Sequence, residues 1–314
     1  MPDSWRQIDV TRNETMSDES SPARYRFGVV VTTLGRVTLL AKLLDSLDGQ
    51  LTTEDQLVIV AQRNELEVRE LVSKYPALPI MVTTSERGAA RGRNVGVTAL
   101  PDGPWLLVFP NDSTWFPPGV IDGLRLAASP ERFRLGAMTV IDDLGPKLKH
   151  LEPGAPLTPV DAWRVIEMGL VISRECFDQL GGFDAAIGTG ATTPWQSGES
   201  TDLVLRALER WPNLSSSFVW LPRTIWVGGV AETFGLSTAA RRWKLRAYGR
   251  GAAKVARDHH FPYVWRLRLL VGGATIGLRN PQYRPLDGAW AFVGRLEGFI
   301  GRTLGPTDRH AVDR

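Results

Sequence analysis

The sequence predicts an α/β protein built around a mostly parallel sheet. Short apolar runs alternate with amphipathic helical segments between positions 25 and 109. This alternation is typical of βαβ units, in which a helix connects two parallel strands. The composition also favours a globular fold, because 43% of the 314 residues are hydrophobic and 23% are charged. A wholly disordered chain is therefore excluded.

The first part of the chain contains the clearest elements. Buried strands are predicted at 27–33, 55–62, 79–84 and 105–109, and helices are predicted between them at 36–47, 64–75 and 87–100. Ligands bind at the carboxyl ends of the strands in such sheets. We therefore expect function in the loops that follow Thr33, Gln62, Thr84 and Phe109.

The second part has a less regular pattern. Strands are predicted at 133–141, 168–173 and 218–221, with a turn at 142–145 and a helix at 200–211. After position 236 the chain becomes helical and basic, then apolar and aromatic. These changes predict a disordered tail at 1–24, a catalytic α/β domain at 25–235 and a basic and apolar helical extension at 236–314.

Cysteine content and charge indicate the cellular setting. Cys176 is the single cysteine, so the chain has no internal disulfide and no cysteine-based zinc site, and we expect this side chain to be buried. The sequence has no signal-like apolar segment and no run near the roughly 18 apolar residues of a spanning helix. These features predict a cytoplasmic protein. The net charge of +3 is too small to indicate a nucleic-acid partner.

A glycine- and arginine-rich segment, Gly88-Ala-Ala-Arg-Gly-Arg-Asn-Val-Gly96, lies between a predicted strand and a predicted helix. Small residues let the backbone approach a phosphate closely, and Arg91 or Arg93 would supply the countercharge. A solvated helix start explains the same pattern without any ligand. The segment alone leaves both interpretations open.

A second polar segment, Asn111-Asp112-Ser113, comes directly after the predicted strand at 105–109. Carboxylate and amide oxygens at such a strand end suit a magnesium or manganese ion that bridges two phosphates. The alternative is an ordinary polar turn, for which this composition is also common.

A third segment places two acids three residues apart, Glu199 and Asp202, at the start of a predicted helix. At this spacing they project from one helix face, where the positive helix end favours their ionised forms. The alternative is an N-cap formed by Ser200 or Thr201 with acidic neighbours. Trp195, just upstream, suits either stacking on a sugar ring or the core.

Together these segments resemble the inverting family 2 glycosyltransferases of the GT-A fold. The likeness begins at Val29-Val-Val-Thr-Thr-Leu-Gly-Arg36 and runs in family order to about Trp211. It includes Met168-Gly-Leu-Val-Ile-Ser-Arg174 and Gly181-Gly-Phe-Asp184, which look like the family's strand and acceptor-side segment. The resemblance implies donor contacts from Thr32, Thr33, Arg36, Gln62, Gly88, Arg93, Asn94, Asn111 and Asp112.

The resemblance also implies a reaction. A hexose would pass from a nucleoside diphosphate sugar of UDP or dTDP type to a carbohydrate or lipid-linked acceptor, in cell-surface polysaccharide or glycoconjugate synthesis. The divalent metal, Mn or Mg, would be held by Asp112, and His259 is a further candidate ligand. Glu199 or Asp202 would be the base, and Trp195 and Asp184 are expected near the sugar or acceptor.

Three departures from the family pattern weaken this assignment. Ala61 stands where the family usually has a nucleobase-binding Asp, Asp112 is the only acid in the metal segment, and Ser200 replaces the Asp that commonly follows Glu199. They motivate a second hypothesis, a non-catalytic nucleotide-sugar-binding protein. A nucleotidyltransferase is disfavoured, because its glycine-rich, basic loop is not present after the first predicted strand.

The C-terminal extension carries a basic stripe at Arg242, Arg246, Arg250 and Lys254, spaced every four residues. A solvated helix face is one interpretation, and binding of anionic lipid or a lipid diphosphate is the other. The apolar stretch at 261–270 follows it. This arrangement predicts either peripheral contact with the inner face of the membrane or a homodimer interface.

Overall fold

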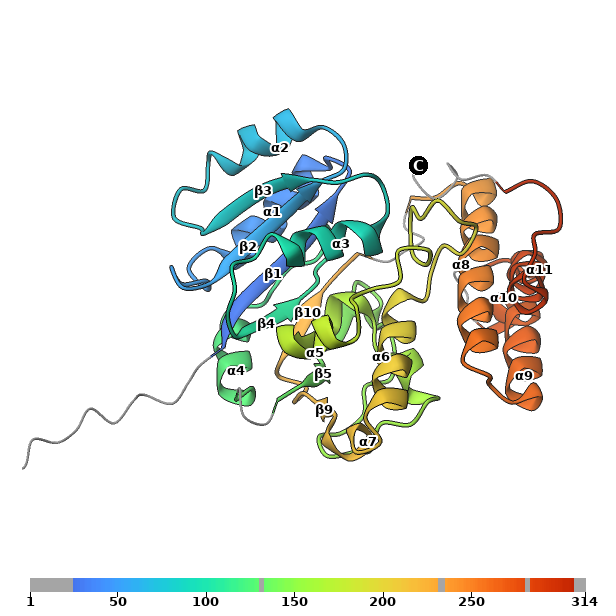
Figure 1. Cartoon of the computed structure of the whole chain (residues 1–314). Coiled ribbons are helices and arrows are strands. Elements are labelled where there is room, and N and C mark those ends of the chain that lie inside the picture. Colours follow the sequence, from blue (N-terminus) through green and yellow to red (C-terminus); the bar gives the residue numbers. More distant parts are fainter. Residues whose placement is uncertain (1–24, 130–132, 231–234, 280–282, 308–314) are drawn as a thin grey trace, which may run out of the picture.

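The computed structural model describes residues 25–129, 133–230, 235–279 and 283–307, and its centre is a seven-stranded sheet with the order β3-β2-β1-β4-β8-β5-β9. Strands β1 (Arg26–Thr33), β2 (Gln56–Ala61), β3 (Ile80–Thr84) and β4 (Trp105–Val108) pair in parallel, as predicted. Helices α1 (Val37–Leu47), α2 (Glu65–Val72) and α3 (Ala89–Thr98) connect them (Figure 1). The tail predicted at 1–24 lies outside the described residues.

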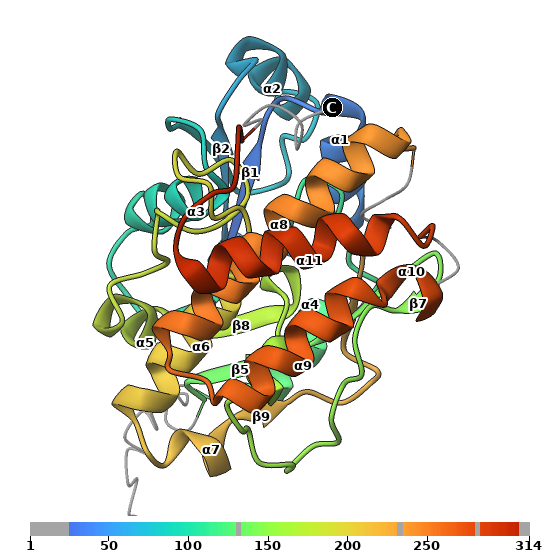
Figure 2. The same ribbon diagram turned by 90° about the vertical axis from the view of Figure 1, so that its right-hand side faces the viewer.

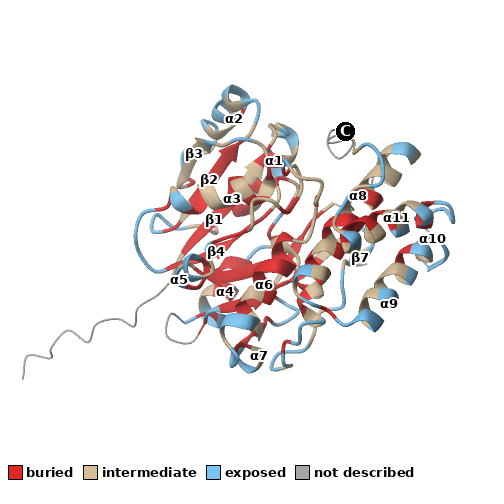
Figure 3. Ribbon diagram, turned by 45° about the vertical axis from the view of Figure 1, so that its right-hand side comes forward, coloured by how far each residue is buried: buried red, intermediate tan, exposed pale blue. Residues whose placement is uncertain are grey.

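The alternation of side chains along β1 divides the core between the two faces of the sheet. Val29 and Val31 pack in the cluster that contains the leucines of α1, whereas Val30 packs in the cluster that contains Val97 of α3 and Leu203 of α6 (Glu199–Arg210). Figure 3 shows the buried strands between these helices. Both faces of the sheet are therefore covered, which explains why its strands are almost wholly apolar.

The second half of the sheet departs from the predicted strand at 133–141. That strand is divided into β5 (Leu135–Ala137) and β6 (Thr139–Asp142), because the N–H of Met138 donates to the oxygen of Gly169 at 2.8 Å. Strand β5 stays in the main sheet. Strand β6 pairs with β7 (Gly145–Pro146) and β10 (Trp226–Gly228) in a separate three-stranded sheet.

Strand β8 (Leu170–Ser173) is antiparallel to β4, with Val108 opposite Val171. Its amino end therefore lies beside the carboxyl end of β4. The short 3₁₀ helix η2 (Glu167–Gly169) precedes β8. It therefore lies at the carboxyl ends of the parallel strands, beside the loops that follow β1 and β4. The remaining short elements are α4 (Val120–Ala127), η1 (Asp161–Arg164), α5 (Arg174–Gln179), α7 (Leu214–Ser217) and β9 (Val219–Trp220).

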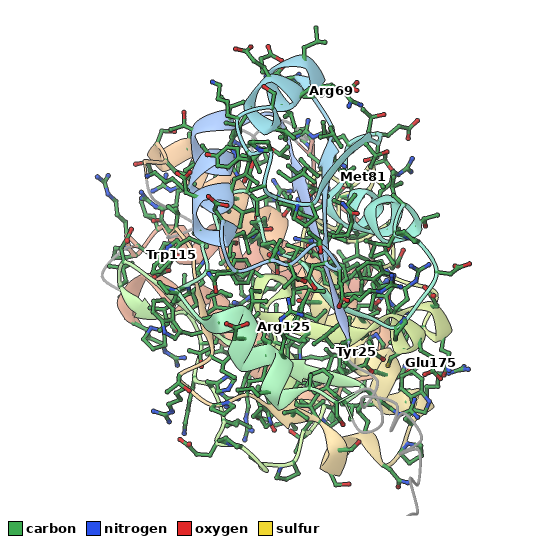
Figure 4. All side chains as sticks on the ribbon, turned by 90° about the vertical axis from the view of Figure 1, so that its left-hand side faces the viewer. Tyr25, Arg69, Met81, Trp115, Arg125 and Glu175 are labelled. Carbon is green, nitrogen blue, oxygen red and sulfur yellow. The ribbon has the colours of Figure 1, made fainter. Side chains whose placement is uncertain are left out.

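A buried carboxylate, Asp55, stabilises the sheet at the amino ends of β1 and β2. Asp55 accepts hydrogen bonds from the backbone N–H of Phe27 at 2.9 Å and of Thr52 at 2.7 Å, and it forms an ion pair with Arg125 of α4. Figure 4 shows Arg125 and Tyr25 near the amino end of β1. These contacts are structural, since ligands bind at the carboxyl ends of the strands.

The C-terminal helices are α8 (Thr238–Asp258), α9 (Tyr263–Ala274), α10 (Ile276–Arg279) and α11 (Asp287–Ile300). Helix α11 lies along α8, and α9 lies beside α11 (Figure 2). The glycines of α11 permit this close packing: a Cβ on Gly294 would overlap the backbone of Arg246. Within the described residues, no helix is both long and apolar enough to cross a membrane.

Three of the four residues of the predicted basic stripe face α11, and the fourth, Lys254, pairs with Asp258 on α8 itself. Arg246 and Arg250 are buried and both pair with the buried Glu297 of α11, while Arg242 pairs with the buried Asp287. The interpretation of these arginines as a solvated or lipid-binding face is therefore wrong. The reason is that α11 supplies carboxylates from a segment far along the sequence and covers this side of α8.

Helix α8 also packs against the α/β domain. Val255 and Ala256 belong to the same buried cluster as Leu203 of α6. The hydroxyl of Ser197 donates to the oxygen of Tyr248 at 2.7 Å, and a Cβ on Gly251 would overlap the backbone of Ser197. This contact brings α8 against the segment that leads into α6.

Candidate active site

The loops at the carboxyl ends of the parallel strands line one cavity of about 570 Å³. Eight of the nine residues expected to bind the donor line it: Thr32, Thr33, Arg36, Gln62, Gly88, Arg93, Asn111 and Asp112. The strand order reverses between β1 and β4, and Thr32 forms a bridge with Asn111 at that point. Such a switch point is where open α/β sheets bind ligands.

Asp112 is buried at this switch point and both its carboxylate oxygens are engaged. The Thr33 hydroxyl donates to Oδ2 at 2.8 Å, and Arg36 donates from Nε to Oδ2 at 3.0 Å and from Nη2 to Oδ1. The carboxylate thus joins the loops after β1 and β4.

The glycine- and arginine-rich segment forms the start of α3 beside the cavity. Gly88, at the N-cap, has a φ of 127°, and a Cβ on Gly92 would come within 2.6 Å of the Thr32 side chain and 2.7 Å of Gln62. Both positions therefore favour glycine. The Gln62 amide donates to the oxygens of Glu86 and Gly88 at 2.8 and 2.9 Å, which fixes the loop before α3.

A buried polar network crosses the floor of the cavity. Arg93 donates to Oε1 of Glu199 at 3.1 Å and to Oδ1 of Asn111 at 2.9 Å. The Asn111 amide donates in turn to Oε1 of Glu167 at 3.2 Å. Two carboxylates are thus linked through one arginine and one amide, and the network joins α3, the loop after β4, η2 and α6.

Glu167 was not identified from the sequence. It lines the cavity and is the first residue of η2, and the antiparallel pairing of β8 with β4 brings η2 beside Asn111. A carboxylate immediately before the strand predicted at 168–173 was the available signal. Other lining residues missed from the sequence are Arg87, Lys147, Trp163, Lys244 and Tyr248.

The pKa of Glu199 is raised above the ordinary value of a glutamate. Burial is the main cause, and the nearby negative charge of Glu167 adds to it, although Arg93 opposes both effects. Protonation of one acid in this pair is therefore tied to the charge of the other.

Asp202, the other predicted base, lies outside the cavity lining. Its Oδ2 accepts from Nε of Arg206 at 2.9 Å, and its Oδ1 lies 2.9 Å from Nε2 of His259. Burial alone would raise the pKa of Asp202, but these hydrogen bonds hold it below the ordinary value. The side chain connects α6 to the end of α8.

His259 is placed away from Asp112. Its Nε2 contacts Asp202, and its Nδ1 lies 2.7 Å from Oε1 of Glu209. Neither ring nitrogen is free to bind a metal ion, and His259 does not line the cavity. The expected role of His259 as a metal ligand does not agree with these contacts, because α6 places two carboxylates around the ring.

Three further predicted residues have structural contacts outside the cavity lining. Asn94 bonds both the N–H and the oxygen of Phe183, at 2.9 and 2.8 Å, and Oδ1 of Asp184 accepts from the Ala186 N–H at 2.8 Å. Trp195 has the Lys254 ammonium 5.8 Å from its ring centre. These contacts shape the segment between α5 and α6. Cys176 is buried, as predicted, and burial raises its pKa to about 12.

Comparisons with known proteins agree with this architecture. No protein-family model and no curated protein sequence matches the chain. Among solved structures, the mannosyltransferase PcManGT from Pyrobaculum calidifontis, in complex with GDP-Man and Mn²⁺, has a TM-score of 0.58 at 15% identity over 90% of both chains. TarS 1-349 from S. aureus, in complex with UDP-GlcNAc, has a TM-score of 0.54 at 13% identity over 88% of this chain and 92% of that one.

The chain has the GT-A fold. At these identities the likeness establishes the architecture alone. The loops after β1 and β4 line the cavity, and α8 contributes Lys244, Tyr248 and Ala252 to its wall.

The charge of the cavity suits a nucleoside diphosphate. Three carboxylates line it, Asp112, Glu167 and Glu199, against five basic side chains. The basic residues are Arg36, Arg87, Arg93, Lys147 and Lys244. The resulting excess of positive charge favours a polyanionic ligand, since arginine and lysine both bind phosphate oxygens.

The site fits a divalent ion that is held mainly by phosphates. Among the described residues, no three His, Cys, Asp or Glu side chains gather as a metal-binding group. Mg²⁺ is commonly bound through one or two carboxylates together with substrate phosphates and water. Asp112 would provide the carboxylate. The Arg36 side chain, which is 57% exposed, has room to release it.

Proposed function

We propose that this protein is an inverting glycosyltransferase that moves a sugar from a nucleoside diphosphate sugar to an acceptor hydroxyl. The observation that carries the proposal is the basic cavity at the switch point of the sheet, where Asp112, Arg36 and the Glu167–Glu199 pair meet. PcManGT and TarS, which have the same fold, were solved with GDP-Man and UDP-GlcNAc. This supports a nucleotide sugar as the ligand here.

The diphosphate would lie between Arg36 and the start of α3. Arg36 is exposed and is positioned by Asp112, so it can turn to the phosphates without unfolding its loop. The amino end of α3 would add the positive end of a helix dipole. When bound, a divalent ion held by Asp112 would supply further positive charge to the leaving diphosphate. We propose a UDP or dTDP donor.

In the reaction, the acceptor oxygen attacks the anomeric carbon from the face opposite the diphosphate. The bond between that carbon and the phosphate oxygen breaks, and its electron pair leaves with the nucleoside diphosphate. Arg36 stabilises the negative charge that develops there. The proton of the acceptor hydroxyl passes to a carboxylate of the Glu167–Glu199 pair. Attack from the opposite face inverts the anomeric centre.

The acceptor is proposed to be a carbohydrate or a lipid-linked sugar, as in cell-surface polysaccharide or glycoconjugate synthesis. Trp163 and Tyr248 bring aromatic rings to the cavity lining. Aromatic side chains combine apolar faces with polar edges, a combination that suits the alternating apolar and hydroxyl surfaces of a hexose.

A non-catalytic nucleotide-sugar-binding protein is the second candidate. The observation that favours it is Ser200, whose hydroxyl donates to the oxygen of Val165 at 3.0 Å and provides no carboxylate. Such a protein would keep the basic cavity and the Arg36–Asp112 pair but would not release nucleoside diphosphate.

A thermal-shift screen followed by a turnover assay tests the two candidates. UDP-, dTDP- and GDP-linked hexoses are added with manganese or with EDTA, because a ligand that binds the native state raises the unfolding midpoint. Slow release of nucleoside diphosphate from the best donor would support the transferase. Binding without release supports the second candidate, and no midpoint shift with any donor overturns both.

A further inference from the structure

The acid with the best access to the cavity is Glu167. Its side chain is 22% exposed, whereas that of Glu199 is 7% exposed. Oε1 of Glu167 accepts from Asn111 at 3.2 Å and lies 3.9 Å from Nη2 of Arg93. Within the described part of the chain, Oε2 has no hydrogen-bond partner. One oxygen is therefore held in place while the other remains open to a substrate hydroxyl.

Glu199 is enclosed by its neighbours. Arg93, which is itself buried, holds its Oε1 at 3.1 Å. On another side, a Cβ on Gly188 would come within 3.0 Å of the Glu199 Cδ. Backbone and guanidinium thus lie against this carboxylate on two sides, which leaves less space for an acceptor oxygen than at Glu167.

The network gives Glu199 a positioning role. Arg93 can only donate hydrogen bonds, so the Oδ1 atom of Asn111 must face it, and the Nδ2 atom of Asn111 is then directed to Glu167. Glu199 fixes Arg93, Arg93 fixes the Asn111 amide, and the amide fixes Glu167. The orientation of the exposed acid therefore depends on the buried one.

Ser200 contributes to the same arrangement. Its hydroxyl donates to the oxygen of Val165, two residues before Glu167. This bond attaches the segment that carries Glu167 to the first turn of α6. The serine at this position thus helps to place an acid that comes from a different element.

We propose that Glu167 is the general base of the transferase and that Glu199 positions it through Arg93 and Asn111. The proposal rests on the glycosyltransferase function argued above. Glu167 takes the proton of the acceptor hydroxyl as that oxygen bonds to the anomeric carbon. The electron pair of the broken carbon–oxygen bond leaves on the diphosphate, so atoms and charges balance.

The test compares Glu167→Gln, Glu199→Gln and Asp202→Asn in the full chain. The substrate is the nucleoside diphosphate hexose that gives the largest thermal shift, and water serves as the acceptor. A base contributes roughly 100- to 10,000-fold to the rate. Glu167→Gln should lower the rate of hydrolysis by that factor while the calorimetric affinity for the nucleoside diphosphate changes less than about twofold.

A rescue experiment separates catalysis from structure. In Glu167→Ala, added formate should restore part of the rate, because a small carboxylate can occupy the vacated space and accept the proton. Glu199→Ala should not respond to formate, since its effect passes through Arg93.

The outcomes distinguish this proposal from the proposed function. If the wild type hydrolyses donor and Glu167→Gln keeps the full rate while Glu199→Gln loses it, Glu199 is the base and the assignment of Glu167 is overturned. The transferase function then stands. If the wild type neither binds nor hydrolyses any of the donors, the proposed transferase function is wrong, and the assignment of Glu167 as its base is wrong with it.

Discussion

Arg36 of the β1–α1 loop donates to both carboxylate oxygens of Asp112 at the end of β4. The pair joins the two loops at the strand switch, and Thr33 adds a third hydrogen bond to the same carboxylate. The guanidinium of Arg36 is therefore already paired with the carboxylate that would hold a divalent ion. Binding of a metal-carrying diphosphate requires Arg36 to move from Asp112 to the phosphates.

The first prediction concerns metal-dependent binding at Asp112. Asp112→Ala should abolish the increase in donor affinity caused by manganese, because it removes the only carboxylate of the 111–113 segment. Ser113→Ala is the matched control and should have a smaller effect. Calorimetric titration of the nucleotide with manganese and with EDTA measures both. Equal wild-type affinities under the two conditions would contradict a metal role.

The second prediction concerns the buried ion pairs between α8 and α11. Glu297→Gln leaves Arg246 and Arg250 buried with no full countercharge. Breaking one partner of a buried pair costs about 3–5 kcal/mol, and urea unfolding should show a loss of that order. Glu152→Gln removes an exposed pair with Arg223 and should cost less than about 1 kcal/mol. Equal losses of stability in Glu297→Gln and Glu152→Gln would mean that the ion pairs between α8 and α11 are exposed to solvent.

Much of the sheet and the donor side of the site could be predicted from the sequence. The strands and helices between Arg26 and Val108 have regular apolar patterns, and the parallel pairing follows from the helices that connect the strands. The loops at Thr33, Gly88 and Asp112 therefore converge as expected. Local sequence is sufficient there because each strand is followed directly by the loop that carries the chemistry.

Glu167 and the basic stripe depended on information that local patterns lack. Glu167 reaches Asn111 because β8 runs antiparallel to β4, and strand direction is not encoded in the residues before a strand. Arg246 and Arg250 are buried because α11, more than 40 positions later, supplies Glu297. In both cases a contact distant in sequence decides the role of the residue.

The third prediction tests the contact between α8 and the entrance to α6. Gly251→Ala places a methyl group against the backbone of Ser197, which cannot move aside as a side-chain end can. We expect a lower unfolding midpoint and reduced donor turnover, because Ser197 and Gly198 line the cavity. Gly272→Ala on α9 meets only the end of the Arg295 side chain and should keep both properties. Unchanged turnover in Gly251→Ala would argue against coupling of α8 to the site.

The fourth prediction concerns the outer face of α9, where Val264, Leu267 and Val271 are exposed. Positions 259–286 contain four arginines and no Asp or Glu. Each basic residue near anionic lipid contributes about 1 kcal/mol, so the protein should co-sediment with phosphatidylserine vesicles at low salt, and Leu267→Asp should weaken this. A stable dimer by light scattering, with no vesicle binding, would assign the face to a second copy instead.

The fifth prediction concerns the pH dependence of folding through His259. Burial alone would lower its pKa, but hydrogen bonds to Asp202 and Glu209 raise the pKa above the ordinary value. The folded state then binds the proton more tightly than the unfolded state, so this stabilisation is complete below the unfolded pKa of about 6.5 and is lost as the pH rises through the folded pKa.

Comparison of the wild type with His259→Gln by urea unfolding at pH 6 and pH 9 tests this linkage. The variant should lose more stability at pH 6 than at pH 9, because the raised pKa of His259 stabilises the folded state only while the ring is protonated. His150→Gln is the control, and its pH dependence should have the opposite sign. Burial lowers the pKa of His150, although the hydrogen bond to the Leu221 oxygen opposes this. The unfolded state binds more protons at His150, so the wild-type histidine becomes less favourable as the pH falls. A His259→Gln effect that is the same at both pH values would mean that folding does not shift the pKa of His259.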